Sequence, residues 1–327
     1  MQVTEADGVF QAGGVKGIAL VGALLGFAER GCARWVNLAG AGASSLVAAY
    51  LACGHDAYDA EQLLRSAPYS RFEDFGPGGP LLGGAWNLLR RRGLARGDYL
   101  RRWVDEQLGG RTFGAVDRGG RSRLKLIAAD VSRRELLVLP DDLSRYRIPG
   151  GYSPIEPDRF PIADAVRMSL SLPYFFEPVR LVHHSSGRDS TIVDGGLLST
   201  VPVWLFDLRD SDPLRPTFGF RLAGHGGLAG RRGHVLERTG WPLRLGSDLF
   251  HTAMEASDAR FESHSTRLRT CHVSVGEIAT TDFRLTPLEQ TELVEGGRQA
   301  ARRFLDLFRP EEYRNTFGRR LSTAVAA

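Results

Sequence analysis

Three glycine-rich turns in this chain carry residue types that could perform acyl transfer. The turn Gly40-Ala41-Gly42-Ala43-Ser44 follows an apolar strand and precedes an apolar helix. In a nucleophile elbow of the form G-x-S-x-G, the middle residue projects a hydroxyl from such a turn, and the flanking glycines let strand and helix approach closely. Here Gly42 takes the middle position and Ser44 the position of the last glycine. The two residue types are therefore exchanged.

A carboxylate that could act as a base ends the apolar strand 191–194. Asp194 is followed directly by Gly195 and Gly196, which turn the chain. Open α/β sheets place their chemistry at the carboxyl ends of strands. An aspartate before a glycine also commonly caps a turn, but beside the other glycine-rich blocks we favour the catalytic interpretation.

The third turn, 11–17, has the composition of an anion-binding loop. Gly13 and Gly14 precede a helix, whose first N–H groups lack partners within the helix and suit a developing oxyanion. Lys16 either supports that anion or lies solvated in the first turn of the helix. A phosphate-binding loop is disfavoured, because Gly17 follows Lys16 where that motif needs serine or threonine.

Four blocks, taken in order, resemble the patatin-like phospholipase family. They are Gln11–Gly17, Gly40–Gly54, Ser169–Val179 and Asp194–Gly196. The likeness extends from about Gly8 to about Leu305, so we expect a patatin-like domain over residues 8–305 and a basic C-terminal tail over 306–327. The resemblance implies an α/β fold of the patatin type, with a mostly parallel central sheet covered by helices on both faces.

The resemblance also implies a chemistry, the hydrolysis of lipid acyl esters by a Ser-Asp dyad without histidine. A lipid or acyl-ester ligand is the expected partner, and neither a cofactor nor a metal ion is expected. The matching positions are Asp194 as the base, Gly13 and Gly14 at the oxyanion site, and Lys16, Gly195 and Gly196 in support. Ala12 stands where many members of the family have a glycine.

The register of the elbow decides whether a nucleophile is present. Without a gap before Gly54, Gly42 falls at the nucleophile position, and Ser44 is rotated by about 200° and displaced by about 3 Å along the helix, away from Asp194. Sliding the elbow by two residues would make Ser44 a surrogate nucleophile, but it would place Leu46 where close packing calls for glycine. We favour the ungapped register.

Two functional hypotheses follow from the register. In one, the protein is an active serine lipid acyl hydrolase that uses Ser44 with Asp194. In the other, Gly42 leaves turnover weak or absent, and the protein is a non-catalytic lipid-binding or regulatory member of the family, a pseudoenzyme. Glycine at this position would relieve backbone strain of about 1–3 kcal/mol.

Strands that alternate with helices must position these turns. Apolar patterning predicts strands at Gly8–Gln11, Trp35–Ala39, Leu124–Asp130 and Glu135–Leu139. Helices are predicted at Lys16–Arg30, Ser45–Ala52, Tyr99–Leu108 and Phe160–Leu172. The nearly all-apolar helix Ser45–Ala52 should lie buried against the sheet.

The stretch Leu81–Leu89 and the arginines after it leave alternatives open. We expect a buried helix at Leu81–Leu89, with a lid that touches membranes as the alternative. The densest basic cluster begins at Arg90-Arg91-Arg92 and could face an anionic lipid surface, but a solvated helix face is the favoured interpretation.

Composition limits the remaining classes. The 327 residues are 43% hydrophobic, and 42 basic against 38 acidic side chains leave a net charge of +4. The arginines are spread too evenly for a nucleic-acid-binding stripe, so no nucleic-acid partner is expected. Three cysteines without metal-ligand spacing predict reduced thiols. With no apolar run of membrane-spanning length and an acidic start, we expect a cytoplasmic protein, with peripheral membrane contact as an open alternative.

Overall fold

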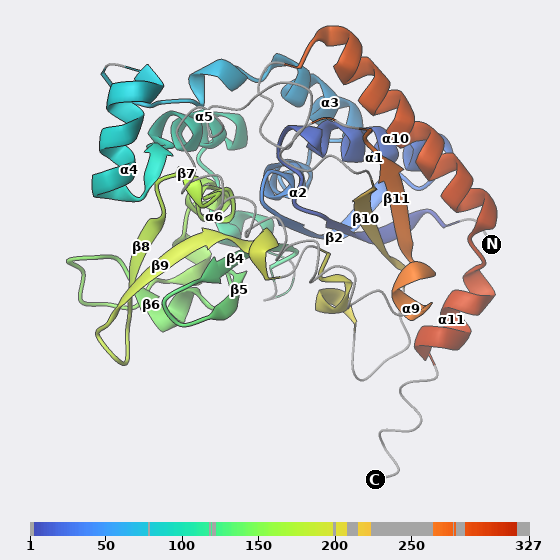
Figure 1. Ribbon diagram of the computed structural model, residues 1–327. Coiled ribbons are helices and arrows are strands. Elements are labelled where there is room, and N and C mark those ends of the chain that lie inside the picture. Colours follow the sequence, from blue (N-terminus) through green and yellow to red (C-terminus); the bar gives the residue numbers. More distant parts are fainter. Residues whose placement is uncertain are drawn as a thin grey trace.

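The central feature of the computed structural model is a sheet through the middle of the molecule, with helices packed on it (Figure 1). The structure describes residues 3–77, 79–117, 119, 122–198, 201–207, 215–223, 264–276, 278 and 285–318. Within these residues, nine strands form the sheet. Their bounds are β1 Glu5–Phe10, β2 Arg34–Ala41, β4 Leu124–Asp130, β5 Glu135–Leu139, β6 Tyr146–Arg147, β8 Val179–His183, β9 Asp189–Asp194, β10 Thr217–Ala223 and β11 Thr270–Ser274.

The sheet is parallel on one side and antiparallel on the other. Strands β11, β10, β1, β2 and β4 are neighbours in that order and run parallel. Strands β5 and β9 each pair antiparallel with β4, and β8 and β6 follow β9 with antiparallel pairing. A separate two-stranded parallel sheet joins β3 (Gly93–Ala95) to β7 (Tyr174–Phe176). The predicted class, an α/β fold with a mostly parallel central sheet flanked by helices, is confirmed.

Strand β4 brings two distant parts of the chain together. β2 runs parallel to β4 and pairs Ala41 with Ile127, whereas β9 runs antiparallel and pairs Asp194 with Ala128. β5 pairs with β4 over residues 126–130, so β2 and β9 share its other edge. The two strands therefore run toward each other, and their carboxyl ends meet at consecutive residues of β4.

The helices reproduce most of the predicted pattern. Their bounds are α1 Gly17–Glu29, α2 Ser44–Ala52, α3 Ala57–Ser66, α4 Ala85–Arg91, α5 Asp98–Leu108, α6 Ile162–Ser169, α9 His264–Arg267, α10 Pro287–Leu307 and α11 Pro310–Gly318. The expected helix Phe160–Leu172 is shorter than predicted. It begins only after Pro161, which has extended backbone, and it ends at Ser169, before Ser171, whose carbonyl accepts a hydrogen bond from the Asp194 N–H.

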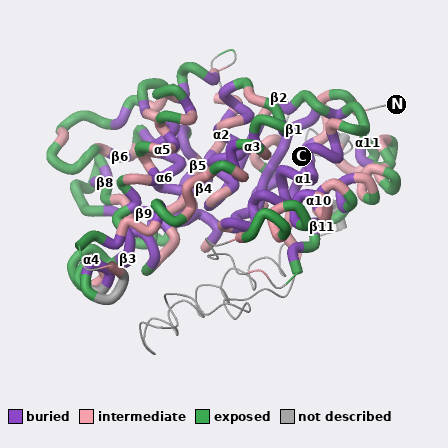
Figure 2. The backbone as a smooth tube through the Cα atoms, turned by 90° about the horizontal axis from the view of Figure 1, so that it is seen from above, coloured by how far each residue is buried: buried purple, intermediate pink, exposed green. Residues whose placement is uncertain are grey.

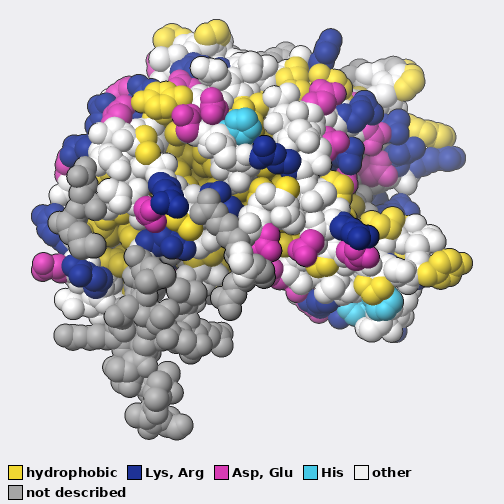
Figure 3. Space-filling view, turned by 180° about the vertical axis from the view of Figure 1, so that it is seen from behind, with side chains coloured by type: hydrophobic (Ala, Val, Ile, Leu, Met, Phe, Trp, Pro, Cys, Tyr) yellow, Lys and Arg dark blue, Asp and Glu magenta, His cyan; other side chains and the backbone are white. Residues whose placement is uncertain are grey.

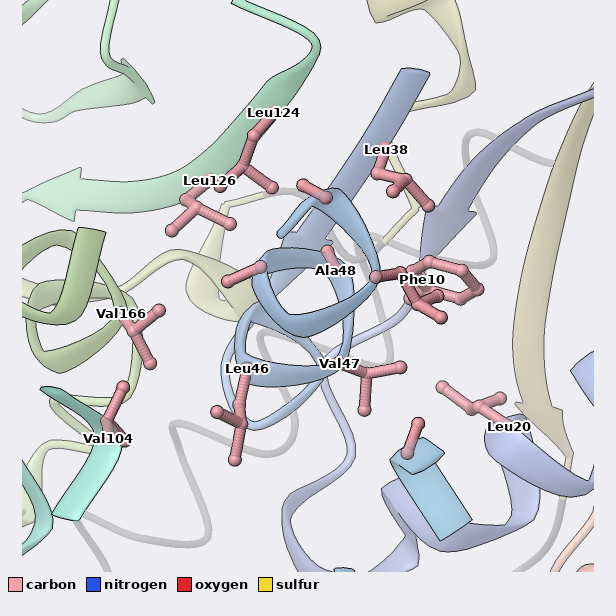
Figure 4. Packing of buried hydrophobic residues seen from close by; sticks show 14 of the residues in the cluster. Phe10, Leu20, Leu38, Leu46, Val47, Ala48, Val104, Leu124, Leu126 and Val166 are labelled. Atoms are coloured by element: carbon pink, nitrogen blue, oxygen red, sulfur yellow. The ribbon is translucent and has the colours of Figure 1, made fainter. Parts of the chain in front are cut away.

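Helix α2 is buried against the sheet, as its composition predicts. Figure 4 shows this helix surrounded by side chains from several elements. Its own Leu46, Val47 and Ala48 lie among residues of the strands and of the helices α1, α5 and α6, namely Phe10, Leu38, Leu124, Leu126, Leu20, Val104 and Val166. Helix α2, into which the Gly42 turn leads, is therefore fixed by contacts from the sheet and from three helices.

The prediction of a buried helix at Leu81–Leu89 is wrong. Leu82, Trp86 and Leu89 are 74%, 58% and 84% exposed. Figure 2 shows α4 at one end of the molecule with a largely exposed trace. The segment is anchored by Asn87, whose amide donates to the carbonyls of Phe75 and Leu94 at 2.8 and 3.1 Å, and by the partly buried Leu88, which packs against the core. Leu82, Trp86 and Leu89 face outward.

Charged side chains are interspersed over the surface. On the face in Figure 3, basic and acidic groups alternate rather than separate into patches. Several described arginines pair with carboxylates, including Arg101 with Asp164 at 2.8 Å and Arg65 with Glu61 at 2.9 Å. Such exposed pairs contribute little stability each. No described helix has both the length and the apolar composition needed to span a bilayer.

The C-terminal helices pack on the body of the fold. At Gly22 of α1 an added side chain would overlap the backbone of Val294 in α10, and at Gly297 of α10 it would overlap the Ala19 carbonyl. In the expected C-terminal tail, α11 is helical, and its buried Tyr313 accepts a hydrogen bond from the Thr217 N–H at 2.9 Å. Residues 319–327 of that tail lie outside the described residues.

The close contact between α1 and α10 predicts opposite effects at two adjacent glycines. Gly297→Ala should lower the free energy of unfolding by about 1–3 kcal/mol or more, because its methyl group meets backbone. Gly296→Ala is the matched control, since the nearest atom, the Ser274 carbonyl oxygen, is 3.6 Å from the added carbon. It should raise stability by about 0.4–1 kcal/mol. Chemical denaturation measures both, and equal effects would contradict the packing argument.

Candidate functional site

The Gly42 turn lies against the carboxyl group of Asp194. Gly42 has a φ of +55°. A side-chain carbon added at Gly42 would lie 2.9 Å from Asp194 Oδ2, 3.2 Å from Oδ1 and 3.0 Å from the Ala12 Cβ. The direction in which residue 42 would project a side chain is therefore toward Asp194. The head-to-head meeting of β2 and β9 on β4 produces this juxtaposition.

Asp194 is buried and has no cationic partner among the described residues. Its Oδ1 accepts a hydrogen bond from the Gly196 N–H at 2.8 Å, and its own N–H donates to the Ser171 carbonyl at 3.0 Å. Burial raises the pKa of Asp194 from 3.8 to about 7, although the hydrogen bond from Gly196 opposes that shift. The carboxyl group is consequently half protonated near neutral pH.

Gly195 brings Asp194 close to β4. A side chain at Gly195 would overlap the Ile127 carbonyl. The same carbonyl accepts a hydrogen bond from the Ser169 hydroxyl at 2.7 Å. Ser169 and Ser171 belong to the block 169–179, but sequence reasoning assigned neither of them a contact. Their role is visible only once β4, α6 and β9 are placed together.

Ser44 faces a different neighbour. Its side chain is fully buried, and its Oγ donates a hydrogen bond of 2.6 Å to the Gln11 carbonyl at the end of β1. At Gly40 a side chain would approach the Ser44 carbonyl oxygen to 2.5 Å, so glycine is needed there for the strand to pass the helix. The structure thus brings Gly42, and not the Ser44 hydroxyl, beside Asp194.

The glycine loop borders the same cavity. Gly13 precedes the 3₁₀ turn Gly14–Lys16, which leads directly into α1. Gly13, Gly14 and Asp194 all line one pocket. The first amides of a helix have no partner within it, so this arrangement can accept an oxygen ligand with partial negative charge. Lys16 is buried and does not line the pocket, so the interpretation of a solvated lysine is wrong.

An apolar pocket leads away from these polar groups. Its empty volume is about 930 Å³, a figure that includes the solvent in the open mouth. Asp194 is the one carboxylate of the described lining, and the rest is almost entirely aliphatic or aromatic. Sequence reasoning missed the aromatic wall, which the turn 69–72 after α3, helix α5 and strand β7 supply. It consists of Tyr69, Phe72, Trp103, Phe175 and Phe176.

Nothing in the described residues assembles a metal site. No group of three or more histidine, cysteine, aspartate or glutamate side chains there has a geometry that could hold a metal ion. The three cysteines are buried free thiols. The chemistry available at the site is therefore that of a carboxyl group, backbone amides and an apolar cavity.

Solved structures share the fold at low sequence identity. VipD from Legionella pneumophila is 16% identical with a TM-score of 0.54, over 94% of this chain and 67% of that protein. ExoU of Pseudomonas aeruginosa, in its heterodimeric complex with SpcU, is 16% identical with a TM-score of 0.50. That match covers 93% of this chain. It covers only 52% of the matched chain in the ExoU–SpcU complex.

Sequence comparison gives closer relationships. The uncharacterized protein YqhO of Bacillus subtilis strain 168 is 36% identical over 304 residues, which cover 91% of this chain and 97% of YqhO. A family model described as patatin-like phospholipase matches residues 8–207, which contain all four blocks and the meeting point on β4. The chain belongs to the patatin-like phospholipase family.

Proposed function

We propose that this protein binds the acyl part of a lipid in the pocket beside Asp194 and turns acyl esters over weakly or not at all. The observation that carries the proposal is where a side chain at position 42 would point. A side chain there would meet the Asp194 carboxyl group, yet the residue is glycine. Without a hydroxyl, covalent catalysis by a Ser-Asp pair lacks its nucleophile.

The pocket supports a lipid acyl ligand. Long aliphatic chains gain free energy in proportion to the apolar surface they bury, and the lining beyond Asp194 offers such surface. The amides of Gly13 and Gly14 and the protonated form of Asp194 can donate to the oxygen of an acyl carbonyl. The polar end of the pocket thus fits the head of an acyl group, and the apolar part fits its chain.

Filling the pocket should weaken acyl binding. Ala67 is half-buried in the pocket wall, and Ala67→Trp should weaken binding of a fluorescent fatty acid by about tenfold or more, because the indole occupies the chain's volume. Ala115→Trp, at an exposed position outside the pocket, is the control. Unchanged titration curves for Ala67→Trp would mean that fatty acids bind elsewhere or not at all.

The alternative, an active hydrolase that uses Ser44, differs in covalent labelling. The unaltered protein should not react with a fluorophosphonate probe, and Gly42→Ser should create labelling at residue 42. That serine would adopt a positive φ and press on Asp194, so we expect a stability loss of about 1–3 kcal/mol. Intact-protein mass spectrometry with peptide mapping reads the label.

Two controls isolate the cause. Gly109→Ser has a similar φ of +63° in open space, so it tests the strain without the site. Ser45→Ala removes a neighbouring buried serine whose hydroxyl has no described partner, and it is matched to Ser44→Ala. Labelling of the unaltered protein that disappears in Ser44→Ala and persists in Ser45→Ala would establish the hydrolase instead.

The raised pKa of Asp194 predicts how stability depends on pH. The folded protein keeps a proton that the unfolded chain releases near pH 3.8, so the free energy of unfolding should fall as the pH rises from about 4 to about 7. A tenfold difference in proton affinity between the folded and unfolded states corresponds to about 1.4 kcal/mol. Asp194→Asn should remove this fall, whereas Asp189→Asn, at an exposed position of the same strand, should keep it. Urea unfolding at pH 5 and pH 8 measures the change, and an equal change in all three proteins would exclude Asp194 as the source.

A further inference from the structure

Helix α4 and the turn before it expose apolar side chains that nothing described covers. Leu82, Trp86 and Leu89 are all more than half exposed. Within α4, Trp86, Leu89 and Arg90 are spaced so that they share one side of the helix. We call Leu82, Trp86, Leu89, Arg90 and Arg92 the α4 face. Exposed apolar side chains that gather on one surface, and not ones that lie singly, mark interaction sites.

The segment that carries the α4 face contains charges of one sign only. From Gly76 to Gly97 the chain contains four arginines and no acidic residue. The Arg90 guanidinium stacks on the Trp86 ring with its carbon 4.3 Å from the ring centroid. Arg91 pairs with Glu177 at 3.2 Å, whereas no described carboxylate pairs with Arg90 or Arg92. A complementary partner should therefore be both apolar and anionic.

The α4 face is attached to a wall of the acyl pocket. Asn87 fastens α4 to the carbonyls of Phe75 and Leu94. Leu94 belongs to β3, which pairs with β7, and two residues of β7, Phe175 and Phe176, line the pocket. The rings of Phe75 and Phe175 also meet edge to face, with centroids 6.5 Å apart. A surface bound by α4 would thus lie beside β3 and β7, and β7 borders the pocket.

We propose that the α4 face docks on an anionic lipid surface. Tryptophan and leucine insert at the boundary between head groups and acyl chains, while arginines attract anionic head groups. A second copy of the chain is a poorer occupant, because a two-fold contact would bring the same arginines against each other. This membrane site goes beyond the proposed acyl binding and does not depend on it.

Sedimentation with lipid vesicles tests the proposal in the full chain. The protein should pellet with phosphatidylcholine vesicles that contain phosphatidylglycerol and much less with phosphatidylcholine alone. Leu82→Ser/Leu89→Ser should reduce the partition coefficient by about tenfold or more. Arg90→Gln/Arg92→Gln should reduce it by about fivefold for each arginine, the equivalent of about 1 kcal/mol each. Added salt should weaken binding by screening.

Matched double variants on other surfaces are the controls. Leu288→Ser/Leu307→Ser removes two leucines of α10 that are 68% and 75% exposed. Arg159→Gln/Arg188→Gln removes two exposed arginines. Both should bind vesicles as the unaltered protein does. Unchanged thermal unfolding of the α4 variants shows that they fold.

Three outcomes would overturn the proposal. The unaltered protein could fail to pellet with anionic vesicles, or both α4 variants could bind as tightly as it does. The third is a lipid-free dimer in analytical ultracentrifugation that Leu82→Ser/Leu89→Ser abolishes, which would assign the face to a second copy. Fatty-acid titration is a separate measurement, so failure of acyl binding and failure of membrane docking are distinguishable.

Discussion

The site depends on a single feature of the sheet, the point on β4 where β2 ends and β9 ends. One strand arrives parallel and the other antiparallel, and their last residues pair with Ile127 and Ala128. Any turn that leaves β2 must then pass the Asp194 carboxyl group. Glycines make this approach possible. Gly40 lies against the Ser44 carbonyl and Gly195 lies against the Ile127 carbonyl, and neither position has space for a side chain.

The electrostatics of the site follow from its burial. Asp194 receives a hydrogen bond from one backbone amide and is otherwise among apolar side chains, so its neutral form is favoured. A neutral carboxyl group costs little to keep in such a cavity, whereas a charged one is expensive without a partner. The polar end of the pocket is therefore compatible with the apolar lining that continues from it, and both suit the same kind of ligand.

Much of the fold could be predicted from the sequence, because local patterns of apolar residues indicate where its helices and strands lie. The apolar run of α2 and the alternation of strands with helices lie in the sequence itself, and so does the position of Asp194 at a strand end. Contacts between distant segments could not be predicted. The hydrogen bond of the Ser44 hydroxyl to Gln11 and the aromatic wall of the pocket are visible only when distant elements are brought together.

Two of the differences between prediction and structure have the same origin. Apolar residues at Leu81–Leu89 suggested burial, but the segment is held through Asn87 and Leu88, and Leu82, Trp86 and Leu89 are left exposed. For Lys16, solvent was one of two interpretations, but the loop that carries it is enclosed. In both cases, residue type was a poor guide because the tertiary environment, and not the helix itself, decides which side is covered.

The order in which the chain is synthesised bears on the glycine loop. Gln11, at its start, is held by β10, since the Gln11 N–H donates to the Phe220 carbonyl at 3.0 Å and the Leu222 N–H donates to Gln11 Oε1 at 2.6 Å. Both partners lie beyond residue 207, where the match to the family ends. On the ribosome, this loop and α2 emerge before β10 does, so a nascent chain carries its apolar helix and its aspartate before it has a finished cavity.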